Sequence, residues 1–150
     1  MLVDSNGFDG IVDSDPEPVE LIANAVRAGR LELVITHIQT EEVAATPAAG
    51  RREKLLGDVP PTTQVSTAGA IWDVSRFDEA TFAGPAEVET IATVAGSSGR
   101  HHNDALILST ARSNGWPLLS NDRRLVAVAE RLGVRHLWIP ELLNKLREMA

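Results

Sequence analysis

Four acidic residues stand where the sequence predicts the end of a buried strand or the start of a helix: Asp4, Glu42, Asp104 and Asp122. Carboxylates gathered in one cleft repel one another and resist ionising together. A hard divalent cation such as Mg²⁺ or Mn²⁺ relieves that repulsion by taking oxygen ligands. Because a carboxylate-held metal beside a phosphate can hydrolyse phosphodiester bonds, that is the chemistry these residue types predict.

Each acid also has an ordinary structural explanation. Asp4 follows a strand, where aspartate often forms a turn. Asp122 lies where it would cap the next helix through its side chain. An acid in the first turn of a helix, such as Asp104, is stabilised by the helix dipole without any chemistry. Asn103 is expected to cap that helix, which leaves the carboxylate of Asp104 free for a cation. The four acids therefore gain meaning only as a set.

Two adjacent glutamates, Glu41 and Glu42, open the helix predicted after the second strand. Neighbouring side chains on a helix point about 100° apart, so at most one of them is expected to enter a given site. We expect Glu42 to face the site and Glu41 to face solvent or the rim.

The elements that must position these acids alternate along the chain. Short apolar runs predict strands at Leu2–Val3, Leu31–Ile35, 118–119 and Val134–Ile139. Capping and periodicity signals predict helices from Asp15 to Gly29, from Gln39 to Ala45, around Arg51–Leu56, from Pro85 to Gly96, from Asn103 to Asn114, from Arg123 to Leu132 and from Pro140 onward. This alternation predicts an α/β fold, a central parallel sheet in a three-layer α/β/α arrangement. Right-handed crossovers then place the carboxyl ends of the strands at one edge, where such folds bind ligands.

The middle of the chain, residues 62–84, is less regular. Strand-like patches at Thr63–Ser66 and Ala70–Val74, separated by Gly69, predict a short hairpin. The stretch from Ser75 to Gly84 is expected to be a loop.

The 150 residues are expected to form one domain, 1–150. The absence of cysteine excludes disulfides and thiolate metal sites. No apolar run reaches membrane-spanning length and the chain opens without a signal-peptide pattern, so a soluble cytoplasmic protein is expected.

The net charge of −7 opposes binding to nucleic acid, although cations bound by the acids would offset it locally. With 4% aromatic residues and no tyrosine, contacts with a nucleic-acid backbone are favoured over base stacking.

The motifs together resemble the PIN domain family, and within it the toxin ribonucleases of the VapC type. The resemblance rests on four segments: Leu2-Val3-Asp4-Ser5-Asn6, Thr36 through Glu42-Val43, Asp104-Ala105-Leu106-Ile107 through Ala111, and Leu118-Leu119-Ser120-Asn121-Asp122. It implies a metal-dependent endoribonuclease in which Asp4, Glu42, Asp104 and Asp122 hold Mg²⁺ or Mn²⁺, with Asn6 and Ser120 as supporting groups.

The same resemblance implies RNA as substrate, an antitoxin protein as partner and a homodimer. Arg100, Arg123 and Arg124 flank the predicted site, as RNA contacts or as ordinary surface charges. One alternative is a catalytically silent PIN-like scaffold that binds RNA or a partner protein. A phosphatase-like or nucleotide-binding α/β domain is a further alternative, disfavoured because the chain has no glycine-rich phosphate loop.

Overall fold

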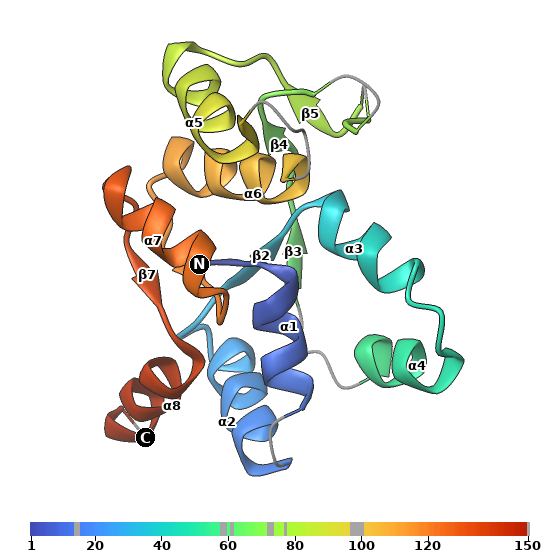
Figure 1. The fold of residues 1–150 in the computed structure, drawn as a ribbon. Coiled ribbons are helices and arrows are strands. Elements are labelled where there is room, and N and C mark those ends of the chain that lie inside the picture. The colour runs from blue at the N-terminus through green and yellow to red at the C-terminus, as the bar shows by residue number, and fades with distance from the viewer. Residues whose placement is uncertain are drawn as a thin grey trace.

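The computed structural model of the chain describes residues 1–13, 16–57, 60, 62–71, 74–76, 78–96 and 101–149 (Figure 1). Its elements follow in the order β1 (Leu2–Val3), α1 (Ser5–Val12), α2 (Pro16–Arg27), β2 (Leu33–Ile35), α3 (His37–Ala44), α4 (Ala49–Gly57), β3 (Thr62–Gln64), β4 (Thr67–Ala68), β5 (Ala80–Thr81), α5 (Pro85–Ala95), α6 (His102–Ser113), β6 (Leu118–Leu119), α7 (Arg123–Arg131), β7 (His136–Leu137) and α8 (Ile139–Glu148). Among the described helices, none has the length and apolar character needed to cross a membrane.

Five strands form one sheet in the order β3-β2-β1-β6-β7, and every neighbouring pair is parallel. β1 lies at the centre, where Leu2 stands opposite Val34 of β2 and Leu118 of β6. The carboxyl ends of the three central strands therefore meet at one edge. The predicted parallel α/β sheet is confirmed.

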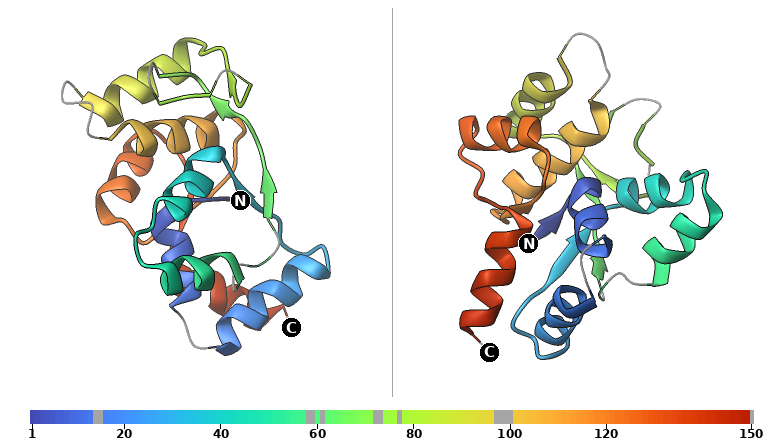
Figure 2. Two further views of the ribbon diagram at one scale, coloured as in Figure 1. Left: turned by 90° about the vertical axis from the view of Figure 1, so that its right-hand side faces the viewer. Right: turned by 60° about the horizontal axis from the view of Figure 1, so that its bottom comes forward.

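Helices cover both faces of this sheet (Figures 1 and 2). Leu2 of β1 belongs to the apolar core formed with α3, α5, α6 and α7, whereas the next residue, Val3, belongs to the core formed with α1, α2 and α8. Full burial of an aliphatic side chain contributes about 1.5–3 kcal/mol, so burial on both faces holds even a two-residue strand in place. The result is the predicted three-layer α/β/α arrangement.

Residues 62–84 differ from the predicted hairpin. β3 pairs in parallel with β2, and β4 pairs in parallel with β5 in a separate two-stranded sheet. The predicted strand at Ala70–Val74 is wrong for residues 70, 71 and 74, which lie in no strand, while residues 72 and 73 lie outside the described part. The predicted loop from Ser75 to Gly84 contains β5. Alternating apolar residues mark where a strand can form, but they do not identify its partner.

The small sheet attaches to α6 rather than to the main sheet. The hydroxyl of Ser109 donates to the Ala68 carbonyl at 2.7 Å, and the Ala68 N–H donates to the Thr110 hydroxyl at 2.9 Å. Both hydroxyls are buried in the middle of α6. Among the described strands β4 pairs with β5 alone, and these two side chains satisfy backbone groups of Ala68.

Several element boundaries also differ from the predictions. α3 begins at His37, earlier than predicted, and α6 begins at His102 with His101 as its N-cap. The predicted capping role of Asn103 is therefore wrong, because this residue lies inside the first turn of α6. α1, which was not predicted, starts directly after Asp4. The predicted cap of α2, Asp15, lies outside the described residues.

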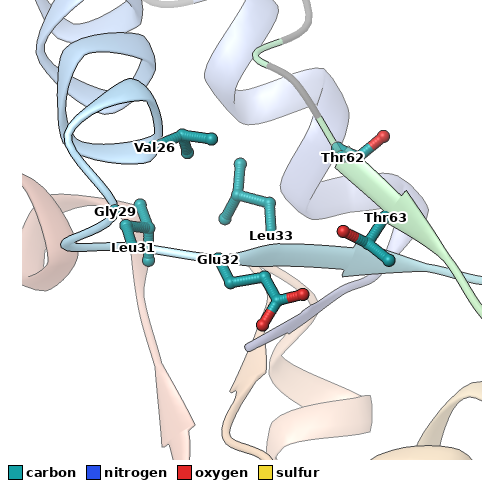
Figure 3. A pocket seen from close by; sticks show the side chains of 7 residues that line it. All are labelled: Val26, Gly29, Leu31, Glu32, Leu33, Thr62 and Thr63. Atoms are coloured by element: carbon teal, nitrogen blue, oxygen red, sulfur yellow. The ribbon is translucent and has the colours of Figure 1, made fainter.

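A cavity of about 370 Å³ lies at the opposite, amino-terminal end of the strands, where β2 and β3 begin (Figure 3). Its lining consists of Val26, Gly29, Leu31, Glu32, Leu33, Thr62 and Thr63. With one carboxylate among seven residues, this cavity lacks the acid-rich chemistry predicted for the other edge of the sheet.

Candidate active site

Asp4 lies at the carboxyl end of the central strand and is only 2% exposed. Its side chain caps α1 by accepting from the Gly7 N–H at 2.5 Å, and it also accepts from the Ser120 hydroxyl at 2.7 Å. A Cβ on Gly7 would stand 2.7 Å from the Leu119 carbonyl oxygen, so only glycine lets the first turn of α1 approach β6 this closely. The backbone thus fixes Asp4 between β1 and β6.

Burial raises the pKa of Asp4 to about 6 from an ordinary value of 3.8. The hydrogen bonds from Ser120 and Gly7 oppose that rise because they favour the carboxylate. The carboxylates of Asp104 and Asp122 add to it. Three acids from distant parts of the chain therefore act on one another at this edge of the sheet.

Glu42 comes to the same edge through the start of α3. Thr36 at the end of β2 caps this helix in a capping box with Gln39, whose side chain accepts from the Thr36 N–H at 2.9 Å. The amide of Gln39 also donates to the Val3 carbonyl at 2.6 Å. Because this bond joins α3 to the strand that carries Asp4, it sets the place of Glu42 relative to that acid.

The carboxylate of Glu42 is held by two donors. The Ser5 hydroxyl donates to one oxygen, and the Asn103 amide donates to the other at 2.6 Å. The neighbouring Glu41 instead forms an ion pair with Arg76 at 2.7 Å on the outer surface. Of the two glutamates, Glu42 is the one that faces the residue next to Asp104.

Asp104 lies in the first turn of α6, and its side chain is 28% exposed. Its Oδ2 accepts from the Arg124 guanidinium and lies 3.4 Å from Nδ1 of His101. Burial raises the pKa of Asp104, with further contributions from Asp122 and Glu42, although Arg124 and His101 act in the opposite direction.

Asp122 caps α7 and accepts from the N–H groups of Arg124 at 2.7 Å and Leu125 at 3.1 Å. Its own N–H donates at 2.9 Å to the Ser120 hydroxyl, the same hydroxyl that donates to Asp4. Ser120 is fully buried and so links the two aspartates across the end of β6.

The remaining predicted residues lie farther from these contacts. Asn6 and Arg123 are exposed, and the described part of the chain gives neither side chain a hydrogen-bond partner. Arg100 lies outside the described residues. Ser5, Asn103 and His101 contact the acids without having been predicted to do so. The available signal in the sequence was that Ser5 and Asn103 adjoin Asp4 and Asp104, and that His101 lies three residues before Asp104.

A model of the PIN domain family matches residues 1–131. The chain belongs to the PIN domain family. PIN domains are generally metal-dependent nucleases, so nuclease chemistry is the function that membership supports. The match contains Asp4, Glu42, Asp104 and Asp122. A search among curated proteins found no match for this chain.

The donor chemistry of this PIN domain fits a hard divalent cation. Its four acids offer only oxygen ligands, which Mg²⁺ and Mn²⁺ prefer, and Asp4 and Asp104 are destabilised as anions by burial and by their acidic neighbours. In the present side-chain arrangement, the described residues contain no group of three or more acids, histidines or cysteines set as a metal-binding cluster. Each acid instead accepts from donors of the protein, with which a bound metal would compete.

Proposed function

We propose that this PIN domain is a metal-dependent endoribonuclease that hydrolyses RNA phosphodiester bonds. The observation that carries the proposal is the meeting of Asp4, Asp104 and Asp122 at the carboxyl edge of the sheet, where each of the last two raises the pKa of the first. Glu42 lies in the same region, because its carboxylate accepts from the amide of Asn103, the residue before Asp104. Carboxylates are gathered there with less positive charge than they need, which is the electrostatic condition for a cation site.

In this proposal the four acids hold Mg²⁺ or Mn²⁺. When bound, the metal supplies a water of lowered pKa and stabilises charge on the leaving oxygen. Ser120 orients Asp4, while Ser5 and Asn103 orient Glu42 through the bonds described above. Arg123 and Arg124 at the start of α7 offer guanidinium groups to the RNA backbone.

The choice of RNA over DNA rests on the resemblance to VapC-type ribonucleases. The same resemblance supports the role of a toxin with an antitoxin partner, a homodimer and a cytoplasmic location. Expression in a bacterial host tests the toxin role. Growth arrest that a coexpressed neighbouring gene relieves would support it, and normal growth with abundant active protein would contradict it.

Cleavage of a circular RNA tests the central proposal, because a circle has no ends and only an endonuclease can open it. We expect linear products with Mn²⁺ or Mg²⁺ and none with excess EDTA. A circular single-stranded DNA of the same sequence should be cut at least about tenfold more slowly, a rate difference of about 1.4 kcal/mol.

Two adjacent variants supply a matched control. Glu42→Gln should lower the cleavage rate at least about a hundredfold, because an amide cannot supply the lost negative charge to the metal. Glu41→Gln removes the same charge one residue away and should leave cleavage within about twofold. Full activity in Glu42→Gln would remove the catalytic role of this residue, and an inactive parent would favour the silent scaffold.

A further inference from the structure

The Asp104 carboxylate is paired with a positively charged side chain of the protein itself. The Arg124 guanidinium donates to Oδ2 of Asp104, and His101 lies 3.4 Å from the same oxygen. Apart from burial, Arg124 is the strongest influence on the pKa of Asp104, and it favours the carboxylate. In the metal-free protein, the charge of this acid is therefore met chiefly by an arginine.

Two features of the Arg124–Asp104 ion pair indicate that another cation can displace the arginine. The Arg124 side chain is 40% exposed, and within the described residues Asp104 is the only acid that it pairs with. Arg51 provides a contrast, since its guanidinium contacts both Asp9 and Asp13. A pair between partly exposed charges contributes little stability, so a stronger cation can replace one partner.

A divalent cation and the guanidinium compete at Asp104. Both need the negative charge of one carboxylate, and they repel each other if both remain close. The present arrangement leaves no three acids set as a metal-binding cluster among the described residues. A cation bound by Asp104 and the neighbouring acids would take over the negative charge that Arg124 now neutralises at Oδ2.

We propose that Arg124 is a displaceable counter-ion, which neutralises Asp104 in the metal-free protein and is released when Mg²⁺ or Mn²⁺ binds. This inference rests on the proposed function, because it assumes that Asp104 is a metal ligand. Arg124 is already at the edge where substrate would lie, so the freed guanidinium is available for bidentate contact with an RNA phosphate. Metal loading and substrate binding are thereby coupled through one side chain.

Mn²⁺ affinity measured by electron paramagnetic resonance at pH 7 tests the competition without any cleavage. Arg124→Gln should bind Mn²⁺ about three- to fivefold more tightly than the parent, since the competing ion pair is worth at most about that factor. The control is Arg123→Gln, which removes the same charge from the preceding, exposed residue and should change the affinity by less than about twofold.

The opposite result has a clear meaning. If Arg124 held Asp104 in place for a metal on its other oxygen, Arg124→Gln would bind Mn²⁺ more weakly, and the inference would be overturned. Equal tightening in both variants would also overturn it, because general electrostatics would then explain the gain. A parent that binds no Mn²⁺ would overturn the proposed metal site and this inference together.

Arginine side-chain NMR signals provide a second readout in the intact protein. Addition of diamagnetic Mg²⁺ should shift the Arg124 Nε–Hε signal, because the guanidinium leaves its carboxylate. The Arg51 signal should remain in place, since its two acids, Asp9 and Asp13, are not among the proposed metal ligands. A stationary Arg124 signal at saturating Mg²⁺ would overturn the proposal even if the Mn²⁺ affinities agreed with it.

Discussion

The two ends of α1 hold aspartates in opposite electrostatic situations. At its start, Asp4 is buried, accepts from neutral donors and has its pKa raised to about 6. At its end, Asp13 is exposed, and the Arg51 hydrogen bond lowers its pKa below the ordinary value. The helix is eight residues long, so these environments lie within one short element.

The contrast separates acids whose charge the protein itself balances from an acid whose charge it does not balance. Arg51 also contacts Asp9 at 2.7 Å, so α4 is joined to α1 by charges that already balance. Asp4 has no cationic partner among the described residues, and two other acids act on it. An acid left in an uncompensated position is maintained at a cost in stability, which is typical of sites that recruit a ligand.

Substituting the aspartate at each end of α1 is expected to give the largest difference. Asp4→Asn should reduce metal-dependent cleavage at least about a hundredfold and remove most of the stabilisation by Mn²⁺, which is about 2.7 kcal/mol for the parent at a hundredfold excess over Kd. Asp13→Asn should retain both. The measurements are RNA cleavage and thermal unfolding with and without Mn²⁺. Retained Mn²⁺ stabilisation in Asp4→Asn would show that the metal does not need this acid.

The pH dependence of stability should have opposite signs at the two ends. Because the folded pKa of Asp4 is raised, its contribution to the free energy of unfolding is fully present below pH 4. That contribution, on the order of 3 kcal/mol, is lost as pH rises through about 6. The lowered pKa of Asp13 stabilises the folded protein at pH values above the pKa of this residue in the unfolded chain. That stabilisation is lost as pH falls through the folded pKa.

Urea unfolding of the metal-free protein checks these signs when each Asn variant is compared with the parent. Asp4→Asn should gain relative stability between pH 4.5 and pH 7.5, and Asp13→Asn should not. A gain of the same size in both variants would mean that the two environments are equivalent.

The smallest effect is expected at the balanced end. Arg51→Gln breaks exposed ion pairs between α4 and α1, so it should cost no more than about 1 kcal/mol in the free energy of unfolding. Its Mn²⁺ affinity should stay within about twofold of the parent. A large loss of Mn²⁺ affinity would show that the far end of α1 is coupled to the acid site, which would weaken the comparison.

The sequence was most informative where one residue type has one physical role. Apolar pairs such as Leu118–Leu119 predicted central strands because only burial on both faces suits them. The alternation of strands and helices predicted that the strands are parallel and that their carboxyl ends lie at one edge of the sheet. Helix geometry predicted that at most one of the two adjacent glutamates faces the site, and the contacts of Glu42 with Ser5 and Asn103 agree with the expectation that it is Glu42.

Other features depended on partners that local sequence does not specify. β3 pairs with β2, and Ala68 of β4 is hydrogen-bonded to Ser109 and Thr110, which lie 41 and 42 residues later in the chain. Asn103 was predicted as a cap because asparagine favours that position, but its bond to a distant glutamate prevailed. The bond from Arg124 to Asp104 also joins separate helices, so no spacing rule could have predicted it.

The central position of β1 has a consequence for how the protein is made. Asp4 is synthesised before its hydroxyl donor, Ser120, which lies 116 residues later in the chain. At about 5–20 residues per second, the ribosome needs on the order of ten seconds to supply that partner. Until β6 emerges, β1 lacks a neighbour on one side and the acids do not meet. During synthesis, the candidate site therefore cannot assemble before the chain has extended past β6.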